Sequence, residues 1–159
     1  MIDESNIMLA TGVHMPNLAG RFNTTVQEYV EIIRDLVAIQ QVARVKDIAR
    51  LRQVTRSSVS TALSNLVELG LVNHEHYGYV ALTETGRELG DILSLRHGVI
   101  QRFLQGFLAL DPEAADREAC VLEHAMSPEA LNALIRFIRI VEKCPQCGSR
   151  VISSSSTQS

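Results

Sequence analysis

Residues 43–82 read ARVKDIARLRQVTRSSVSTALSNLVELGLVNHEHYGYVAL and decide the fold. Apolar residues recur at helical spacing over 45–51 and 55–69, with a predicted turn between the two helices. Gly70 is a typical signal for the end of the second helix. Strand-forming residues on both sides of Tyr77-Gly78 predict a hairpin over 71–82. With a further helix before them, these elements are typical of a winged helix-turn-helix, whose last helix enters the DNA major groove.

The second of these helices has a polar face suited to DNA. It carries short hydroxyl side chains and one arginine, so it can approach base edges closely, and the arginine can bind a guanine or a phosphate. Any single residue of this face could equally be an ordinary solvated side chain. We expect DNA contacts from this polar face, from the turn before it, from the basic segment 44–56 and from the hairpin. The residues are Arg44, Arg52, Thr55, Arg56, Ser57, Ser58, Thr61 and Tyr77.

The bulk composition favours packed helices and separates charge along the chain. Of the 159 residues, 46% are hydrophobic and only 4% aromatic, and the net charge is −3. A net negative charge argues against binding to nucleic acid, but the local charge decides. The segment 44–56 has five basic residues and one acid, Asp47, whereas acids gather over 111–123. The sequence thus predicts one basic region for DNA and one acidic region for a cation.

The termini and cysteines indicate the compartment. The sequence shows no export signal at its start and no apolar run long enough to span a bilayer. Its three cysteines do not suggest a disulfide framework. We therefore expect a cytoplasmic protein without a membrane partner.

Four further helices are expected outside the DNA-reading region. They are predicted over 24–40, where Thr24 or Thr25 would form the N-terminal cap, over 83–108, from Asp111-Pro112, and from Ser127-Pro128 to 142. The acidic one contains EACVLEHAMS, in which Cys120, Glu123 and His124 lie at i, i+3 and i+4 and so share one helix face. A thiolate, a carboxylate and an imidazole suit a divalent transition metal, although a buried cysteine beside a solvated acid and histidine is the plainer alternative.

Five stretches in order give the chain a resemblance to a known family. They are TTVQEYVEII (24–33), residues 43–72, LTETGRELG (82–90), LRHGVIQRFL (95–104) and EACVLEHAMS (118–127). From about Thr24 to Cys144 the chain resembles the metal-dependent repressors typified by the diphtheria toxin repressor and the manganese transport regulator. The resemblance implies a short form without the SH3-like domain, with metal ligands on three helices: Glu28, Glu31, His97, Cys120, Glu123 and His124.

This ligand set is a hybrid of two branches of that family. Manganese sensors resemble it at Glu28 and Glu31 but have a carboxylate in place of Cys120, whereas iron sensors have the cysteine but a methionine in place of Glu28. A thiolate favours softer or borderline metals, and carboxylates suit Mn(II) and Fe(II). We expect Fe(II), with Mn(II) second. The ancillary site of iron sensors would map to His97, Gln101 and Asp116, which are weaker ligands for a second metal.

Two features concern assembly. Apolar stripes on the last helices are expected to form a dimer interface, with an intramolecular core as the alternative: Phe103, Leu104, Phe107, Leu131, Leu134, Ile135 and Ile138. Cys144 and Cys147 form a CxxC pair, which is half of a zinc site. Two tails in a dimer would supply four ligands for Zn(II), whereas a reduced pair without a structural role is the alternative.

The expected protein is mostly α-helical, with an N-terminal winged helix-turn-helix and a C-terminal helical domain that binds metal and dimerises. The expected boundaries are a flexible arm (1–23), the DNA-binding domain (24–83), the helical domain (84–143) and a CxxC and Ser-rich tail (144–159). The predicted function is repression of metal uptake or homeostasis genes by a homodimer on a palindromic operator. The alternative is a winged-helix regulator that senses a small molecule or thiol oxidation. A metalloenzyme is disfavoured, since no nucleophile–base pair or phosphate loop is evident.

Overall fold

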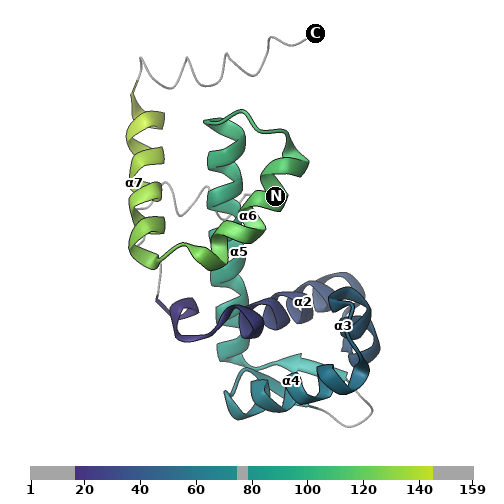
Figure 1. Cartoon of the computed structure of the whole chain (residues 1–159). Coiled ribbons are helices and arrows are strands. Elements are labelled where there is room, and N and C mark those ends of the chain that lie inside the picture. Colours follow the sequence, from purple (N-terminus) through teal and green to yellow (C-terminus); the bar gives the residue numbers. More distant parts are fainter. Residues whose placement is uncertain (1–16, 75–78, 145–159) are drawn as a thin grey trace. The chain divides into compact units, whose positions relative to one another are not determined.

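A computed structural model describes residues 17–74 and 79–144, which divide into two compact units (Figure 1). One unit is Arg21–Leu93, and the other combines the residues up to Gly20 with those from Ser94 onward. The boundary between Leu93 and Ser94 falls inside one long helix, α5 (Glu84–Gly106). Most of the expected N-terminal arm, the hairpin residue Tyr77, and Cys147 with the serine run lie outside the described residues.

The unit Arg21–Leu93 is a winged helix-turn-helix, which confirms the predicted fold class. Its elements are α2 (Thr24–Gln40), β1 (Ala43–Arg44), α3 (Val45–Arg52), α4 (Arg56–Glu68), β2 (Val72–His74), β3 (Tyr79–Leu82) and the start of α5. Both β1 and β2 pair antiparallel with β3, so the strand order is β1-β3-β2. In the hairpin, Val72 is opposite Leu82 and His74 is opposite Val80.

Side-chain caps define where these helices start and end. Thr55 accepts a hydrogen bond from the Ser58 backbone and caps α4, and Gly70, with φ +71°, follows the end of that helix as predicted. The expected cap of α2 was wrong: Asn23, and neither threonine, accepts from the Val26 backbone. Asparagine is at least as good a cap as threonine, and the helix begins one residue earlier than a Thr24 cap would allow.

Two short elements were not predicted from the sequence. Strand β1 contains only Ala43 and Arg44, and a single 3-10 turn, η1, covers Ala19–Arg21 with Ala19 fully buried. Neither segment is long enough to show a hydrophobic period. β1 exists because β3 pairs with it from far along the chain, and such pairing leaves no local signal.

The apolar faces of α2, α3 and α4 form the core of this unit. Fully or almost fully buried are Val30, Ile33, Ile48, Val59, Leu63, Leu66 and Leu71. Val37 and Leu69 are apolar but 39% and 42% exposed, since they lie in the last turn of α2 and at the end of α4.

A close approach at the start of α5 joins that helix to the hairpin. Thr83 caps α5 by accepting from the Gly86 backbone, and its hydroxyl donates to the Gly70 carbonyl. A side chain at Gly86 would collide with the Leu71 carbonyl oxygen. Gly86 is therefore required by the contact with the chain entering β2.

The other unit contains the rest of α5 with α6 (Pro112–Ala125) and α7 (Pro128–Lys143), capped by Asp111 and Ser127 as their Asp-Pro and Ser-Pro starts suggest. Its core includes Leu104, Leu131, Ile135 and Ile138, which are at most 6% exposed. These four of the seven residues expected at a dimer interface thus belong to the core of one chain. Among the described residues, no helix is both long and apolar enough to cross a membrane.

Candidate functional site

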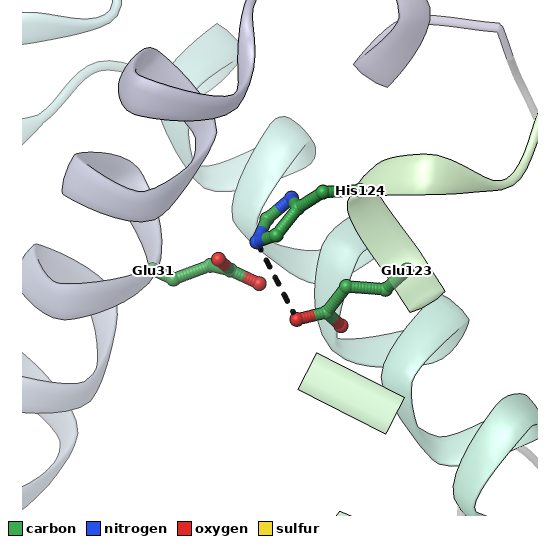
Figure 2. Close-up of side chains that lie close together, drawn as sticks. All are labelled: Glu31, Glu123 and His124. Atoms are coloured by element: carbon green, nitrogen blue, oxygen red, sulfur yellow. Dashed lines mark ion pairs between the residues drawn. The ribbon is translucent and has the colours of Figure 1, made fainter. Parts of the chain in front are cut away.

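A buried carboxylate between two imidazoles marks the candidate metal centre in the helical unit. Glu123 on α6 is only 2% exposed. Its Oε1 lies 3.6 Å from Nε2 of His124, the pair joined by the dashed line in Figure 2. Its Oε2 lies 3.3 Å from Nδ1 of His97, which comes from α5. Three predicted ligands are therefore brought together within this unit.

The electrostatics of His97 reflect this environment. The Glu123 carboxylate raises the pKa of His97 from its ordinary 6.5 to about 9, with a further contribution from Asp116 and against the opposing effect of burial. Positive charge is thus favoured beside the buried carboxylate. A divalent metal would replace that charge, so the donor set of Glu123, His97 and His124 fits such an ion.

Asp116 lies on the other side of the His97 ring. His97 Nε2 is 3.0 Å from Asp116 Oδ1, and Gln101 donates to the same oxygen at 3.2 Å. The three residues expected for an ancillary site are therefore adjacent. The same contacts also suit a different role, which is to orient the His97 ring. A histidine that binds a metal through one ring nitrogen is usually oriented by a carboxylate at the other. Asp116 has the position for that orienting role, which sequence reasoning did not assign.

The remaining residues of the helical unit differ in burial. Cys120 is one turn before Glu123 on α6 and is exposed. Arg96, next to His97, is 4% exposed and donates to the Met126 carbonyl at 2.6 Å, where α6 ends. It was missed because a buried arginine gives no periodic signal. Cys144 is partly buried at the end of α7.

The other two expected ligands belong to the winged-helix unit. Glu28 and Glu31, the latter drawn in Figure 2, lie one turn apart on α2 and are partly buried. Glu28 Oε2 forms an ion pair with Nη1 of Arg52 at 2.8 Å. This ion pair joins an expected metal ligand to an expected DNA-binding residue, and nothing in the sequence pattern predicted it.

The exposed face of α4 is the candidate DNA-reading surface. Arg56, Ser57, Ser58 and Thr61 are all on α4, and all four are exposed, as is the capping Thr55. The Thr55 hydroxyl lies 2.8 Å from each of the Ser57 and Ser58 hydroxyls. Thr61 donates its hydroxyl proton to the Ser57 carbonyl, which leaves its oxygen to accept from a base.

Arg44 belongs to the sheet. It lies in β1 with its guanidinium 5.2 Å from the ring centre of Tyr79 on β3, and it donates to the Tyr79 hydroxyl at 3.3 Å. The hairpin residue expected to contact DNA, Tyr77, lies outside the described part of the chain. The structure therefore adds Tyr79 as the aromatic that supports a basic side chain beside the wing.

Two family models match the chain in succession. The N-terminal DNA-binding domain of iron-dependent repressors matches residues 21–80, and their metal-binding and dimerisation domain matches 83–151. The transcriptional regulator MntR of Salmonella typhimurium is 34% identical over 112 residues, which are 70% of this chain and 71% of the regulator. The chain belongs to the metal-dependent repressor family.

Other relatives agree with this membership. An uncharacterized HTH-type transcriptional regulator of Methanocaldococcus jannaschii is 40% identical over 92 residues, covering 58% of this chain and 74% of that protein. The crystal structure of T. acidophilum IdeR superposes with a TM-score of 0.63 at 28% identity, covering 75% of this chain. This chain spans 55% of the length of that IdeR chain.

Family membership decides several expectations. The matched domains bind DNA, bind metal and dimerise, which confirms a DNA-binding, metal-dependent repressor and a homodimer. The relatives are named as transcriptional regulators, so the chain is a regulator rather than an enzyme.

Proposed function

We propose that the chain represses metal uptake or homeostasis genes and that Fe(II), with Mn(II) second, activates it for binding to a palindromic operator in the cytoplasm. The observation that carries the proposal is the buried Glu123 with an imidazole on each side. A carboxylate is rarely buried without a compensating charge, and here the compensation comes from groups that are themselves metal ligands.

The proposed ligands are Glu123, His124, His97 and Cys120 of the helical unit together with Glu28 and Glu31 of α2. The family resemblance supports the two α2 residues, and the donor chemistry supports all six. The bound ion would supply positive charge that neutralises the carboxylates. His97 would bind it through neutral Nδ1 while Nε2–H donates to Asp116, so that the ring keeps its orientation.

DNA binding is proposed for Arg44, Arg52, Thr55, Arg56, Ser57, Ser58, Thr61 and Tyr77. Arg56 stands at the first turn of α4, where a side chain can reach a base edge or a phosphate. The Cys144–Cys147 pair is proposed as a zinc site shared by two chains. The domain boundaries expected from the sequence remain our proposal for the functional organisation.

Fluorescence anisotropy under anaerobic conditions tests the function. The DNA would be the region upstream of the protein's own gene and of nearby metal-transport genes, with Fe(II), Mn(II) or a chelator present. Tight binding only with metal is expected. Equal binding by the chelated and metal-loaded protein would refute metal activation, and loss of binding on thiol oxidation alone would favour the redox alternative.

Two matched substitutions on α6 test the site itself. Glu123→Gln is nearly isosteric and should lower metal affinity by roughly 10- to 100-fold, because a charged ligand becomes a neutral amide. Glu118→Gln removes an exposed charge from the same helix and should leave affinity within about twofold. Cys120→Ser should weaken Fe(II) more than Mn(II) if the thiolate is a ligand. Equal metal affinity in the two glutamine variants would refute the assignment of Glu123.

A further inference from the structure

We propose that Arg52 is a counter-ion that competes with the metal for Glu28. In the metal-free protein it holds the Glu28 carboxylate, and metal binding at Glu28 releases its guanidinium to a DNA phosphate. The inference rests on the proposed function, because it needs Glu28 to be a metal ligand and Arg52 to face DNA.

The contact is specific and lies within one unit. Arg52 Nη1 forms an ion pair with Glu28 Oε2 at 2.8 Å, and the two side chains are only 27% and 32% exposed. The guanidinium also lies over the ring of Tyr29, 5.3 Å from its centre. Tyr29 is 4% exposed, so its ring is held in the core and provides a fixed surface for the arginine.

The pairing is nevertheless incomplete. Nε of Arg52 is buried and has no hydrogen-bond partner among the described residues. An unsatisfied buried donor costs free energy that contact with water or a phosphate would recover. Arg52 is the last residue of α3, immediately before the turn that leads to α4. Arg52 therefore lies close in sequence to the candidate DNA-reading helix α4. One of its N–H donors, Nε, is still available for a further hydrogen bond.

A divalent ion at Glu28 changes this balance. The ion would take electron density from the carboxylate and place a like charge near the guanidinium, so both effects weaken the Arg52–Glu28 pair. The coupling is reciprocal: if metal binding weakens the Arg52–Glu28 pair, the pair weakens metal binding by the same free energy. Removing Arg52 should therefore tighten metal binding even when no DNA is present.

Arg50 provides the matched control. It lies on the same helix, is 73% exposed and pairs with Asp47 at 3.7 Å, away from Glu28. The first measurement uses Mn(II) alone, with the free ion quantified by electron paramagnetic resonance. Arg52→Gln should bind Mn(II) roughly threefold more tightly than wild type, and Arg50→Gln should match wild type. Arg52→Lys keeps the charge and should stay nearer to wild type than Arg52→Gln.

The second measurement follows the released arginine. In chelator, Glu28→Gln should bind non-specific duplex DNA more tightly, with a salt dependence steeper by about one counterion, because Arg52 becomes available to a phosphate. Glu88→Gln removes an exposed carboxylate from the same unit and should not change the slope. Thermal unfolding of each variant confirms that it is folded.

The outcomes distinguish the competition between Arg52 and the metal from the proposed function on which it rests. If wild type binds Mn(II) and responds to it on DNA while Arg52→Gln and Arg50→Gln bind the ion equally, the competition is refuted and the proposed function stands. If wild type binds neither Mn(II) nor Fe(II), the proposed function fails and the competition fails with it. Tighter Mn(II) binding by Arg52→Gln alone, with a steeper salt slope in Glu28→Gln, supports the proposal.

Discussion

His97 places Nδ1 3.3 Å from Oε2 of Glu123, and this contact joins α5 to α6 inside the helical unit. The carboxylate is almost fully buried, so a positive imidazole partner compensates its charge when no metal is bound. The pair links three measurable properties of the protein, namely the titration of a histidine, the pH dependence of stability and the binding of a metal.

The titration of His97 is the most direct prediction. In the metal-free protein its pKa is expected at about 9, because the Glu123 and Asp116 carboxylates stabilise the imidazolium. NMR titration of the histidine ring protons measures this value. Glu123→Gln should lower the pKa of His97, since it removes the main cause of the shift. A His97 that titrates near its ordinary 6.5 in the wild-type protein would contradict the structure.

Stability should depend on pH in the corresponding direction. The pKa of His97 is raised on folding from its ordinary 6.5 to about 9, so the folded state binds the proton more tightly than the unfolded chain. Its contribution is fully present below about pH 6.5 and is lost as the pH rises through about 9. Urea unfolding in chelator at several pH values would show this loss. The His97→Gln variant should lack it, and an identical profile for both proteins would refute the link.

Burial on α2 predicts a contrast between two isoleucines. Ile33 is fully buried and Ile39 is 82% exposed on the same helix. Ile33→Ala should lower the free energy of unfolding by about 2–5 kcal/mol, because it removes packed methylene groups and leaves a cavity. Ile39→Ala should change it by no more than about 0.5 kcal/mol. Denaturant titration of both variants checks the difference, and similar losses would contradict the placement of α2.

Two glycines on α5 predict opposite effects of one methyl group. Gly86→Ala would push a Cβ against the Leu71 carbonyl oxygen, so the chain leading to β2 must move, at a cost of about 1–3 kcal/mol. Gly106→Ala meets no atom within 4 Å and should be neutral or stabilise by up to about 1 kcal/mol, since alanine favours a helix. Thermal unfolding distinguishes them; an unharmed Gly86→Ala variant would refute the close approach.

Local signals in the sequence were sufficient for much of the fold. The helices were placed to within two residues because apolar periodicity, Asp-Pro and Ser-Pro starts and Gly70 act over a few neighbouring residues. The hairpin after α4 was also predicted from local signals, namely strand-forming residues on both sides of a turn. The helical spacing singled out Cys120, Glu123 and His124 as possible ligands. The resemblance added Glu28, Glu31 and His97, which periodicity alone would have left as ordinary helix residues.

Tertiary packing decided the features that join distant segments. β1 forms only where β3 pairs with it, and Leu104 and Ile138 were assigned to the core of one chain by the helices that cover them. Asp116 reaches His97, and Arg52 reaches Glu28, across 19 and 24 positions of the sequence respectively. Helical periodicity in the sequence indicates which residues share one face of a helix. It does not indicate which other helix packs against that face. The charge partners of the metal ligands therefore depend on the packing of the helices.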